Sequence, residues 1–399
     1  MNQNETNDFS IDLADLAQAI RLREGVEGVQ RALWVLYSQD IPSTRVWSAE
    51  LRIPVPVLAA LRGELERRNV IESGRGYRLT NAGRSWLAEI FSIRETISST
   101  CPSCQGSGRV LPSEIYPILE EFSEICADRP AADVTLDQSH ATPETGIRKA
   151  LMLLEKGLLA EPLLFLGDDD LISVACHLMR RRFASEDAAE IRVLDIDTRY
   201  LDYINTVTSG DVATQQYDVR EAIPQDLPGK FKVAFTDPAY TSNALTAFSF
   251  RCMQALQKEG LLLLSMPVPD LNTYHHLQKQ LISMNFVLQE IHPNFNQYFG
   301  ASLHAHVSTL FVCQKTVAQE PNESSFLHFS PFYTGETRIT GGIYECTLCD
   351  TIYKVGPGEE YITVQELKEA GCHECGNTFF RRLGSRSSDS DPSSELNLK

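Results

Sequence analysis

The sequence predicts an α/β protein whose central domain is a doubly wound, mostly parallel sheet. Three observations carry this prediction. Short apolar runs alternate with amphipathic stretches from about residue 134 to residue 315, which is typical of βα units. Gly167 directly follows the first apolar run, where such folds bind nucleotide-type cofactors. Two last strand patterns, Val287–Ile291 and Val307–Val312, suit an antiparallel pair.

Length and composition set the outer limits. The chain has 399 residues, too many for one ordinary core, so we expect several units. The net charge of −17 disfavours overall attraction to nucleic acid or an anionic membrane, and it favours cationic partners. We expect no membrane span, because no long apolar run occurs. Ten cysteines, with no signal-peptide pattern, predict a cytoplasmic protein with thiols and metal sites.

Residues 1–98 are expected to form a winged-helix-like domain. Residues 1–95 hold 12 arginines, no lysine and 13 acids, so this near-neutral unit need not bind DNA. Dimerisation is an equal reading of the pattern. We expect a homodimer or higher homo-oligomer, with nucleic acid disfavoured but possible here. The expected helices are Gly25–Tyr37, Ser48–Leu51, Val55–Asn69 and Asn81–Phe91, and the expected strands are Val70–Glu72 and Tyr77–Thr80.

Residues 99–129 read as a linker and helix with one CxxC pair, Cys101 and Cys104, which is half a metal site. Residues 130–318 read as a Rossmann-like domain. An antiparallel pair after five parallel strands is the usual arrangement in class I methyltransferase-type folds. The expected helices are Pro143–Lys156, Leu171–Arg182, Tyr200–Thr206, Ala244–Lys258 and Leu271–Met284, and the expected parallel strands are Leu163–Leu166, Ile191–Ile196, Gln215–Tyr217, Lys232–Thr236 and Leu261–Ser265.

Three consecutive acids, Asp168, Asp169 and Asp170, follow Gly167 where a cofactor-binding turn normally carries more glycines. Carboxylates there repel phosphate and attract a cationic cofactor or substrate. They can orient a protonated amine and accept its proton. Helix capping explains one or two of these acids, most easily Asp168. Because a third carboxylate adds repulsion, we expect at least one of the acids to act in function.

Two later strand ends supply candidates for cofactor binding. Asp195 and Asp197 end the strand pattern IRVLDID, where an acid commonly accepts hydrogen bonds from ribose hydroxyls. We favour Asp195 for this role and Asp197 second, because Asp197 also suits a helix N-cap before Thr198. Asp218 follows the next short strand, where it either contacts the adenine amino group or lies in a surface turn.

The fourth strand pattern ends in DPAYT, which is close to the D/N-P-P-Y signature of enzymes that alkylate amino nitrogens. Proline stiffens such a loop, and tyrosine offers a ring and a hydroxyl. Asp237 and Tyr240 are therefore candidate catalytic residues. Ala239 stands where the signature has its second proline, which reshapes the loop. The segment HPNFNQYF, around Phe295 and Asn296, is a candidate edge of the pocket.

Four cysteines near the C-terminus form two CxxC pairs, with 22 residues between the pairs. Four thiolates in this pattern suit tetrahedral zinc, whereas free thiols would leave a short unit with little core. We therefore expect a zinc-ribbon-like unit at residues 341–383 and a disordered tail at residues 384–399. The expected ligands are Cys346, Cys349, Cys372 and Cys375.

Together these motifs resemble the bis(aminopropyl)spermidine synthases, the branched-chain polyamine synthases of archaea and thermophilic bacteria. The resemblance rests on LDQSHATPETGIRKALMLLEKG, LLFLGDDDLISVACHL, VLDID and TDPAYT, over about residues 130–315. It implies successive aminopropyl transfer from decarboxylated S-adenosylmethionine to the N4 amine of spermidine, releasing methylthioadenosine. It also implies a catalytic aspartate in the GDDD turn, for which we take Asp169, and it makes Thr142 of TPET a candidate for cofactor binding.

The leading interpretation is therefore an aminopropyltransferase acting on spermidine or a related polyamine. Intact S-adenosylmethionine carries a carboxylate that three acids would repel, and decarboxylation removes this conflict. A nitrogen methyltransferase on RNA or DNA is the alternative that the DPAY loop, the winged helix and the cysteine pairs favour. The net charge of −17 and the acidic turn oppose it. A non-enzymatic polyamine sensor that binds DNA is a third reading.

Overall fold

The computed structural model describes residues 11–93, 96, 109–267, 271–299, 307–317, 333 and 342–385, except residues 23, 40, 52, 75, 186, 357, 358, 362 and 363. The chain divides into two compact units, residues 1–133 with 138–330 and residues 134–137 with 331–399. In the part of the chain described, no helix has both the length and the apolar character needed to cross a bilayer.

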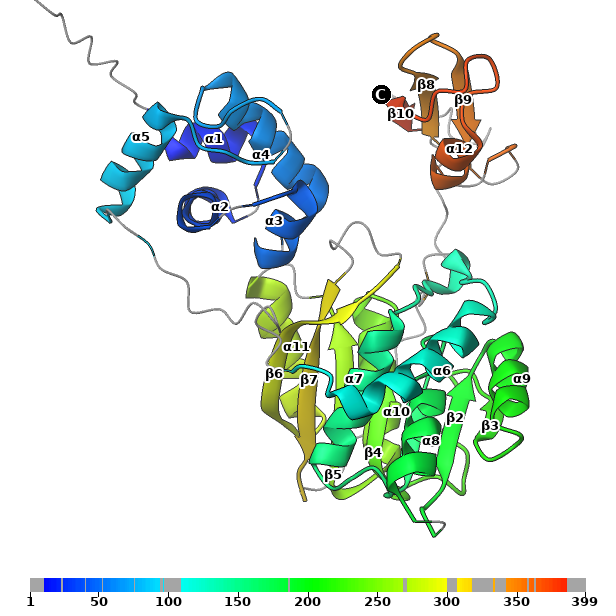
Figure 1. Ribbon diagram of the computed structural model, residues 1–399. Coiled ribbons are helices and arrows are strands. Elements are labelled where there is room, and N and C mark those ends of the chain that lie inside the picture. The colour runs from blue at the N-terminus through cyan, green and yellow to red at the C-terminus, as the bar shows by residue number, and fades with distance from the viewer. Residues whose placement is uncertain are drawn as a thin grey trace, which may run out of the picture. The chain divides into compact units, whose positions relative to one another are not determined.

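A seven-stranded sheet in the order β3-β2-β1-β4-β5-β7-β6 organises the larger unit. The first five strands run parallel, and β7 runs antiparallel to both β5 and β6. In Figure 1 these strands stand side by side from β3 to β6. This confirms the doubly wound sheet with a terminal antiparallel pair. The strands are β1 Leu163–Leu166, β2 Ile191–Asp195, β3 Ala213–Gln216, β4 Phe231–Thr236, β5 Leu256–Met266, β6 Phe286–Gln297 and β7 Val307–Lys315.

Helices follow four of the five parallel strands, and two more precede β1. The expected helix over Ala244–Lys258 ends at Ala255, because β5 already begins at Leu256. The last two strands, β6 and β7, are both longer than the sequence patterns that predicted them. β6 includes Pro293, which is tolerated because β6 is an edge strand. The helices are α6 Tyr116–Ala127, α7 Pro143–Glu155, α8 Ile172–Phe183, α9 Thr198–Val207, α10 Ser242–Ala255 and α11 Leu271–Ser283, with short 3-10 turns at Ser113–Ile115 and Val134–Leu136.

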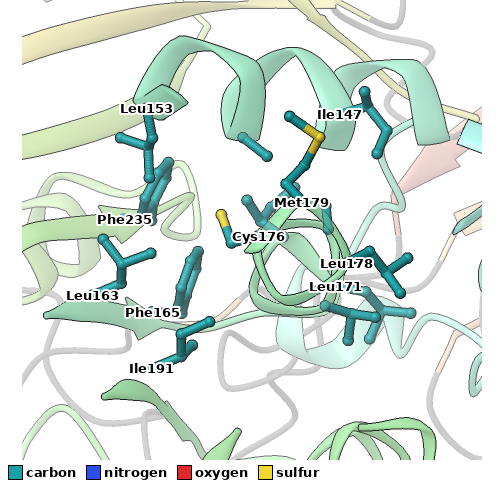
Figure 2. Packing of buried hydrophobic residues seen from close by; sticks show 14 of the residues in the cluster. Ile147, Leu153, Leu163, Phe165, Leu171, Cys176, Leu178, Met179, Ile191 and Phe235 are labelled. Atoms are coloured by element: carbon teal, nitrogen blue, oxygen red, sulfur yellow. The ribbon is translucent and has the colours of Figure 1, made fainter. Parts of the chain in front are cut away.

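The core beside the predicted cofactor turn lies between the sheet and helices α7 and α8. The rings of Phe165 on β1 and Phe235 on β4 stack with centroids 4.7 Å apart. Figure 2 shows these rings below α7 and beside Cys176 of α8, with Met179 nearer to Ile147 of α7. Burying one phenylalanine or methionine side chain completely stabilises a fold by roughly 1.5–3 kcal/mol. The packing fixes the carboxyl ends of β1 and β4 side by side.

Helix α7 is buried along most of its length, from Thr145 to Leu153. It packs against α6 on one side and α8 on another. At Gly146 a Cβ atom would come within 2.7 Å of the Phe122 ring, so only glycine allows this approach of α6. The TPET segment is therefore the start of a buried helix, and side chains on α7 can reach the sheet edge.

The N-terminal part of the larger unit has its own core around Trp47, which is fully buried. The first helix, α1, had no counterpart in our prediction. In place of the two expected strands, the structure has two isolated β-bridges, Ile71–Leu79 and Ile41–Tyr77. The expected hairpin is not extended because Tyr77 pairs with Ile41 and not with the strand opposite it. The helices are α1 Leu13–Ala19, α2 Gly25–Ser38, α3 Thr44–Leu51, α4 Val55–Arg67 and α5 Asn81–Phe91.

The smaller unit contains a three-stranded antiparallel sheet in the order β10-β8-β9. Its small core includes Tyr353, Val355 and Leu367 together with two of the predicted zinc ligands, Cys346 and Cys372. So few apolar side chains give little stability without a further constraint. The elements are β8 Gly342–Cys346, β9 Ile352–Val355, α12 Val364–Ala370 and β10 Phe380–Ser385.

Candidate active site

The turn between β1 and α8 is strained and held in place by Asp168. Gly167 has a φ of 78° and Leu171 a φ of 57°, so both lie in the left-handed region. The Asp168 carboxylate accepts hydrogen bonds from the backbone amides of Ile172 (2.7 Å) and Ser173 (3.1 Å). This confirms that Asp168 caps the first turn of α8. Burial raises its pKa to about 8 in spite of these bonds.

Asp169 and Asp170 face the segment that leads into α7. The Asp169 carboxylate accepts one hydrogen bond, from the Ser139 amide at 3.2 Å, and Asp170 accepts one from the Ala141 amide at 2.5 Å. Asp170 is only 6% exposed, whereas Asp169 is partly exposed and lines a small pocket. Of the three acids, Asp169 therefore has the carboxylate most accessible to a ligand.

The acids at the end of β2 have different surroundings. Asp195 is buried, and its carboxylate accepts hydrogen bonds from the amides of Asp168 and Asp197, both at 2.9 Å. Burial raises the pKa of Asp195. Asp197 is the N-cap of α9 and pairs with Arg199, as its capping alternative predicts. Although burial opposes it, Arg199 and the Gln138 amide lower the pKa of Asp197.

Asp218 forms an ion pair with a nearby residue, and Thr142 forms a backbone hydrogen bond with a distant segment. Asp218 pairs with the Arg220 guanidinium at 2.6 Å, and although burial opposes it, Arg220 lowers the pKa of Asp218. The Thr142 amide donates a hydrogen bond to the Gln297 carbonyl at 2.8 Å. Thr142 therefore ties the start of α7 to the end of β6, which brings the HPNFNQYF segment to the site.

The loop after β4 places Asp237 at the centre of the sheet edge. One carboxylate oxygen, Oδ2, accepts a hydrogen bond from the Tyr298 hydroxyl. Within the described residues, the buried Oδ1 atom has no partner. The pKa of Asp237 is raised to about 7. Burial and Asp170 raise it, whereas Lys149 and Tyr298 lower it. Ala239 is buried, and Tyr240 is 43% exposed. Desolvation and Asp237 raise the pKa of Tyr240.

Sequence reasoning missed two side chains of this site. Tyr298 lies within the segment that we expected at the pocket edge, but its tyrosine was not singled out. Its hydroxyl also contacts Ser308 Oγ at 2.8 Å, and Ser308 accepts a bond from Asn296. Lys149 lies on α7 and is 3% exposed. The available signal was a lysine within the apolar run RKALMLL, four residues before Leu153.

These groups belong to a small pocket that is lined by both apolar and acidic side chains. Burial raises the pKa of Asp169 well above its usual value, and repulsion from Asp170, Asp195 and Asp237 raises it further. A cation bound here would relieve this repulsion, and an anion would increase it. The pocket is lined by Lys149, Phe165, Gly167, Asp168, Asp169, Asp170, Ile172, Phe235, Thr236, Asp237 and Leu263.

The four C-terminal cysteines lie together. Their sulfur atoms are all within 4.8 Å of one another, with Cys346–Cys375 at 3.6 Å and Cys349–Cys372 at 3.4 Å. Tetrahedral zinc with bonds of about 2.3 Å would hold its sulfurs about 3.8 Å apart, so these thiols fit a metal ion. Although burial opposes it, the Tyr353 hydroxyl helps to lower the pKa of Cys372 to about 5. Cys101 and Cys104 lie outside the described residues.

A known protein family matches the central part of the chain. The branched-chain polyamine synthase A C-terminal domain matches residues 117–332. The N(4)-bis(aminopropyl)spermidine synthase of Methanocaldococcus jannaschii is 30% identical over 254 residues, 61% of this chain and 70% of that protein. An uncharacterized protein of the same organism is 34% identical over 385 residues, 95% of this chain and 94% of that protein.

The solved structures agree on the fold. The branched-chain polyamine synthase of Thermus thermophilus, crystallised with N4-aminopropylspermidine and 5'-methylthioadenosine, superposes with a TM-score of 0.63 at 23% identity. The match covers 82% of this chain and 98% of that one. The family model matches more than half of the chain, and one relative is 34% identical over nearly the whole of it. This chain therefore belongs to the branched-chain polyamine synthase family.

Proposed function

We propose that this protein transfers aminopropyl groups from decarboxylated S-adenosylmethionine to the N4 amine of spermidine. The family supports the reaction, since three curated relatives are named N(4)-bis(aminopropyl)spermidine synthases. The observation in this chain that carries the proposal is the acidic pocket at the end of β1 and β4, where Asp169 and Asp237 have no arginine partner among the described residues. Such a pocket suits a cationic amine and a donor without a carboxylate.

The chemistry requires a neutral amine. Spermidine carries protonated amines near neutral pH, and a protonated amine has no lone pair for attack. Asp169, whose pKa burial and its acidic neighbours raise, takes a proton from the N4 ammonium group. The free Oδ1 of Asp237 holds the amine by a hydrogen bond, beside Tyr240.

The nitrogen lone pair then attacks the methylene carbon bonded to the sulfonium sulfur. The C–N bond forms as the C–S bond breaks, and the bonding electrons leave with sulfur to give neutral methylthioadenosine. The tertiary ammonium product loses its proton to water or to a carboxylate. The protein contributes alignment and charge, which account for much of the rate enhancement in such displacements.

The donor would lie across the strand ends beside the acceptor. Asp195 is our ribose ligand, with Asp197 second, and Asp218 is placed for the adenine amino group. Each of these carboxylates still has lone pairs after its bonds to protein groups. Thr142 supports the donor site from the start of α7.

The N-terminal and C-terminal parts of the chain have proposed roles of their own. We propose that residues 1–98 form a winged-helix-like domain used for homo-oligomerisation and that residues 341–383 form a zinc-ribbon-like unit. The four thiols within 4.8 Å support zinc, held by Cys346, Cys349, Cys372 and Cys375, in a structural role. Such thiols persist in a reducing cytoplasm.

Product mass distinguishes the possible reactions. The purified protein is incubated with spermidine and either decarboxylated or intact S-adenosylmethionine, and the products are weighed by mass spectrometry. We expect one or two aminopropyl increments with the decarboxylated donor and no change with the intact one. A methyl increment would instead identify a nitrogen methyltransferase, and no product with either donor would contradict enzymatic transfer.

A further inference from the structure

Lys149 is the most unusual charged residue of the active site. It lies on the buried helix α7 and is 3% exposed, yet within the described part of the chain no hydrogen bond or ion pair joins it to a partner. An unpaired buried ammonium group is costly, and folded proteins rarely keep one without a use. The side chain lines the same pocket as Asp169 and Asp237.

The surroundings of Lys149 show where its charge acts. The pocket that Lys149 lines has an apolar part formed by Phe165, Ile172, Phe235 and Leu263. In such surroundings, a charge acts over longer distances than in water. Asp237 presents a buried oxygen, Oδ1, that also has no partner among the described residues. An unpaired cation and an unpaired carboxylate oxygen therefore line one small pocket.

We propose that Lys149 is a positioning residue that keeps Asp237 ionised, so that Asp237 can hold the cationic acceptor amine. This inference rests on the proposed function. Without a nearby positive charge, burial and the neighbouring acids would keep Asp237 protonated near neutral pH, and a neutral carboxyl group attracts a polyamine only weakly. Consistent with this role, Lys149 is the largest influence that lowers the pKa of Asp237 against burial.

Other groups also influence the ionisation of Asp237, but none of the other described residues that line the pocket carries a positive charge. Burial and Asp170 disfavour its ionisation, and Tyr298 favours it through one hydrogen bond. Among the described side chains that line the pocket, Lys149 alone is cationic. The titratable groups around Asp237 are Lys149 from α7, Asp168, Asp169 and Asp170 from the turn after β1, Tyr240 from its own loop and Tyr298 from the segment after β6.

Replacing Lys149 has two opposite expected effects, which makes the proposal testable. If Lys149 keeps Asp237 ionised, its loss weakens amine binding at neutral pH, and alkaline pH restores the binding. If Lys149 only repels the cationic substrate, its loss strengthens amine binding at every pH. The sign of the change therefore distinguishes the two roles.

The test compares the wild type with Lys149→Met, which keeps the stem and removes the charge, and with Lys149→Arg, which keeps the charge. Lys156→Met at the C-cap of the same helix is the matched control, because Lys156 pairs with Glu290 on β6 and does not line the pocket. Kinetics are measured from pH 6 to pH 9.5 with spermidine and decarboxylated S-adenosylmethionine. Should Lys149→Met not fold, as judged by circular dichroism, Lys149→Gln replaces it.

For Lys149→Met we expect the KM for spermidine to rise about tenfold or more at pH 7 and to return toward the wild-type value by about pH 9, with kcat changed less. The acid limb of kcat/KM should move to higher pH. Lys149→Arg should restore most of the binding, and Lys156→Met should match the wild type. An unchanged acid limb, or a lower KM for Lys149→Met at pH 7, would overturn the proposal.

Calorimetry of spermidine binding without any donor separates this inference from the proposed reaction. If the wild type makes no aminopropyl product, the reaction is wrong, but spermidine binding still reports on Lys149. We expect the affinity of Lys149→Met to be lower than that of the wild type at pH 7 and similar at pH 9. Equal affinities at pH 7 would rule out the role of Lys149 even if the enzyme is active.

Discussion

Two sets of carboxylates lie along the same edge of the sheet, and their surroundings differ. The outer acids, Asp197 and Asp218, each pair with an arginine two residues later, and this lowers the pKa of both carboxyl groups. The inner acids, Asp169 and Asp237, have no arginine partner among the described residues, and burial raises the pKa of both. The outer acids are neutralised by the protein itself, whereas the inner ones are left for a cationic ligand.

The largest expected effect comes from the inner set. Asp169→Asn keeps the size of the side chain but cannot accept a proton, so we expect kcat for aminopropyl transfer to fall by about 10³-fold. The measurement is product formation by mass spectrometry, with folding checked by circular dichroism. Asp202→Asn, on the exposed side of α9, is the control and should retain full activity. Full activity of Asp169→Asn would move the catalytic role to another acid of the turn.

The pH dependence tests the second inner acid. Asp237 must be ionised to hold the amine, and its pKa is raised to about 7, so kcat/KM should fall as the pH drops through about 7. Asp237→Asn should lower kcat/KM by about 100-fold at pH 8 and shift this acid limb, because the remaining limb then reports only the base Asp169. A variant that kept the wild-type acid limb would show that another group controls it.

Stability should respond in opposite directions in the two sets. Asp197→Ala removes the N-cap of α9 and an ion pair, and should lower the free energy of unfolding by about 1 kcal/mol. Asp169→Ala removes a carboxylate that the neighbouring acids repel and should raise the free energy of unfolding at pH 8. Urea denaturation at pH 8 measures both. The comparison fails if the two variants shift stability in the same direction.

The acids Asp168 and Asp237, whose pKa values burial raises, also predict how stability varies with pH. Asp168 and Asp237 have folded-state pKa values of about 8 and about 7, above the usual value near 4. The folded state therefore binds more protons than the unfolded state over this window, so these two groups make the free energy of unfolding decrease from about pH 4 to pH 8. Asp237→Asn should make this decrease shallower, as thermal unfolding across that range would show. An identical slope would contradict the burial of Asp237.

The smallest effect on catalysis is expected far from both sets. Cys349→Ser should remove bound zinc and unfold the residues around the cysteines, because their apolar core is small. Transfer activity should stay within about twofold of the wild type, since the pocket is built from the sheet of the larger unit. Elemental analysis should find about one zinc per wild-type chain. Absence of zinc from the wild type would remove the metal assignment.

Much of the fold follows from local patterns in the sequence. Apolar runs and the glycine at Gly167 are sufficient to predict the parallel strands, their order along the chain and the acidic turn after β1. The capping roles of Asp168 and Asp197 were also predictable, because a cap depends on residues only a few positions away.

Contacts between distant segments were not predictable from these patterns. The bond between Tyr298 and Asp237 joins residues 61 positions apart, and it depends on the order of β4, β5, β7 and β6 in the sheet. Lys149 interrupts an apolar run of the sequence, and only the packing of α7 places it in the pocket. The contrast between the inner and outer acids likewise becomes clear only once their partners are known.

The central claim is that the unpaired inner acids select a donor without a carboxylate. Calorimetry of decarboxylated and intact S-adenosylmethionine binding to the wild type and to Asp169→Asn tests it most directly. We predict that the wild type binds the decarboxylated donor at least about tenfold more tightly and that the preference narrows in Asp169→Asn. Equal affinity of the wild type for the two donors, or tighter binding of the intact one, would contradict the account.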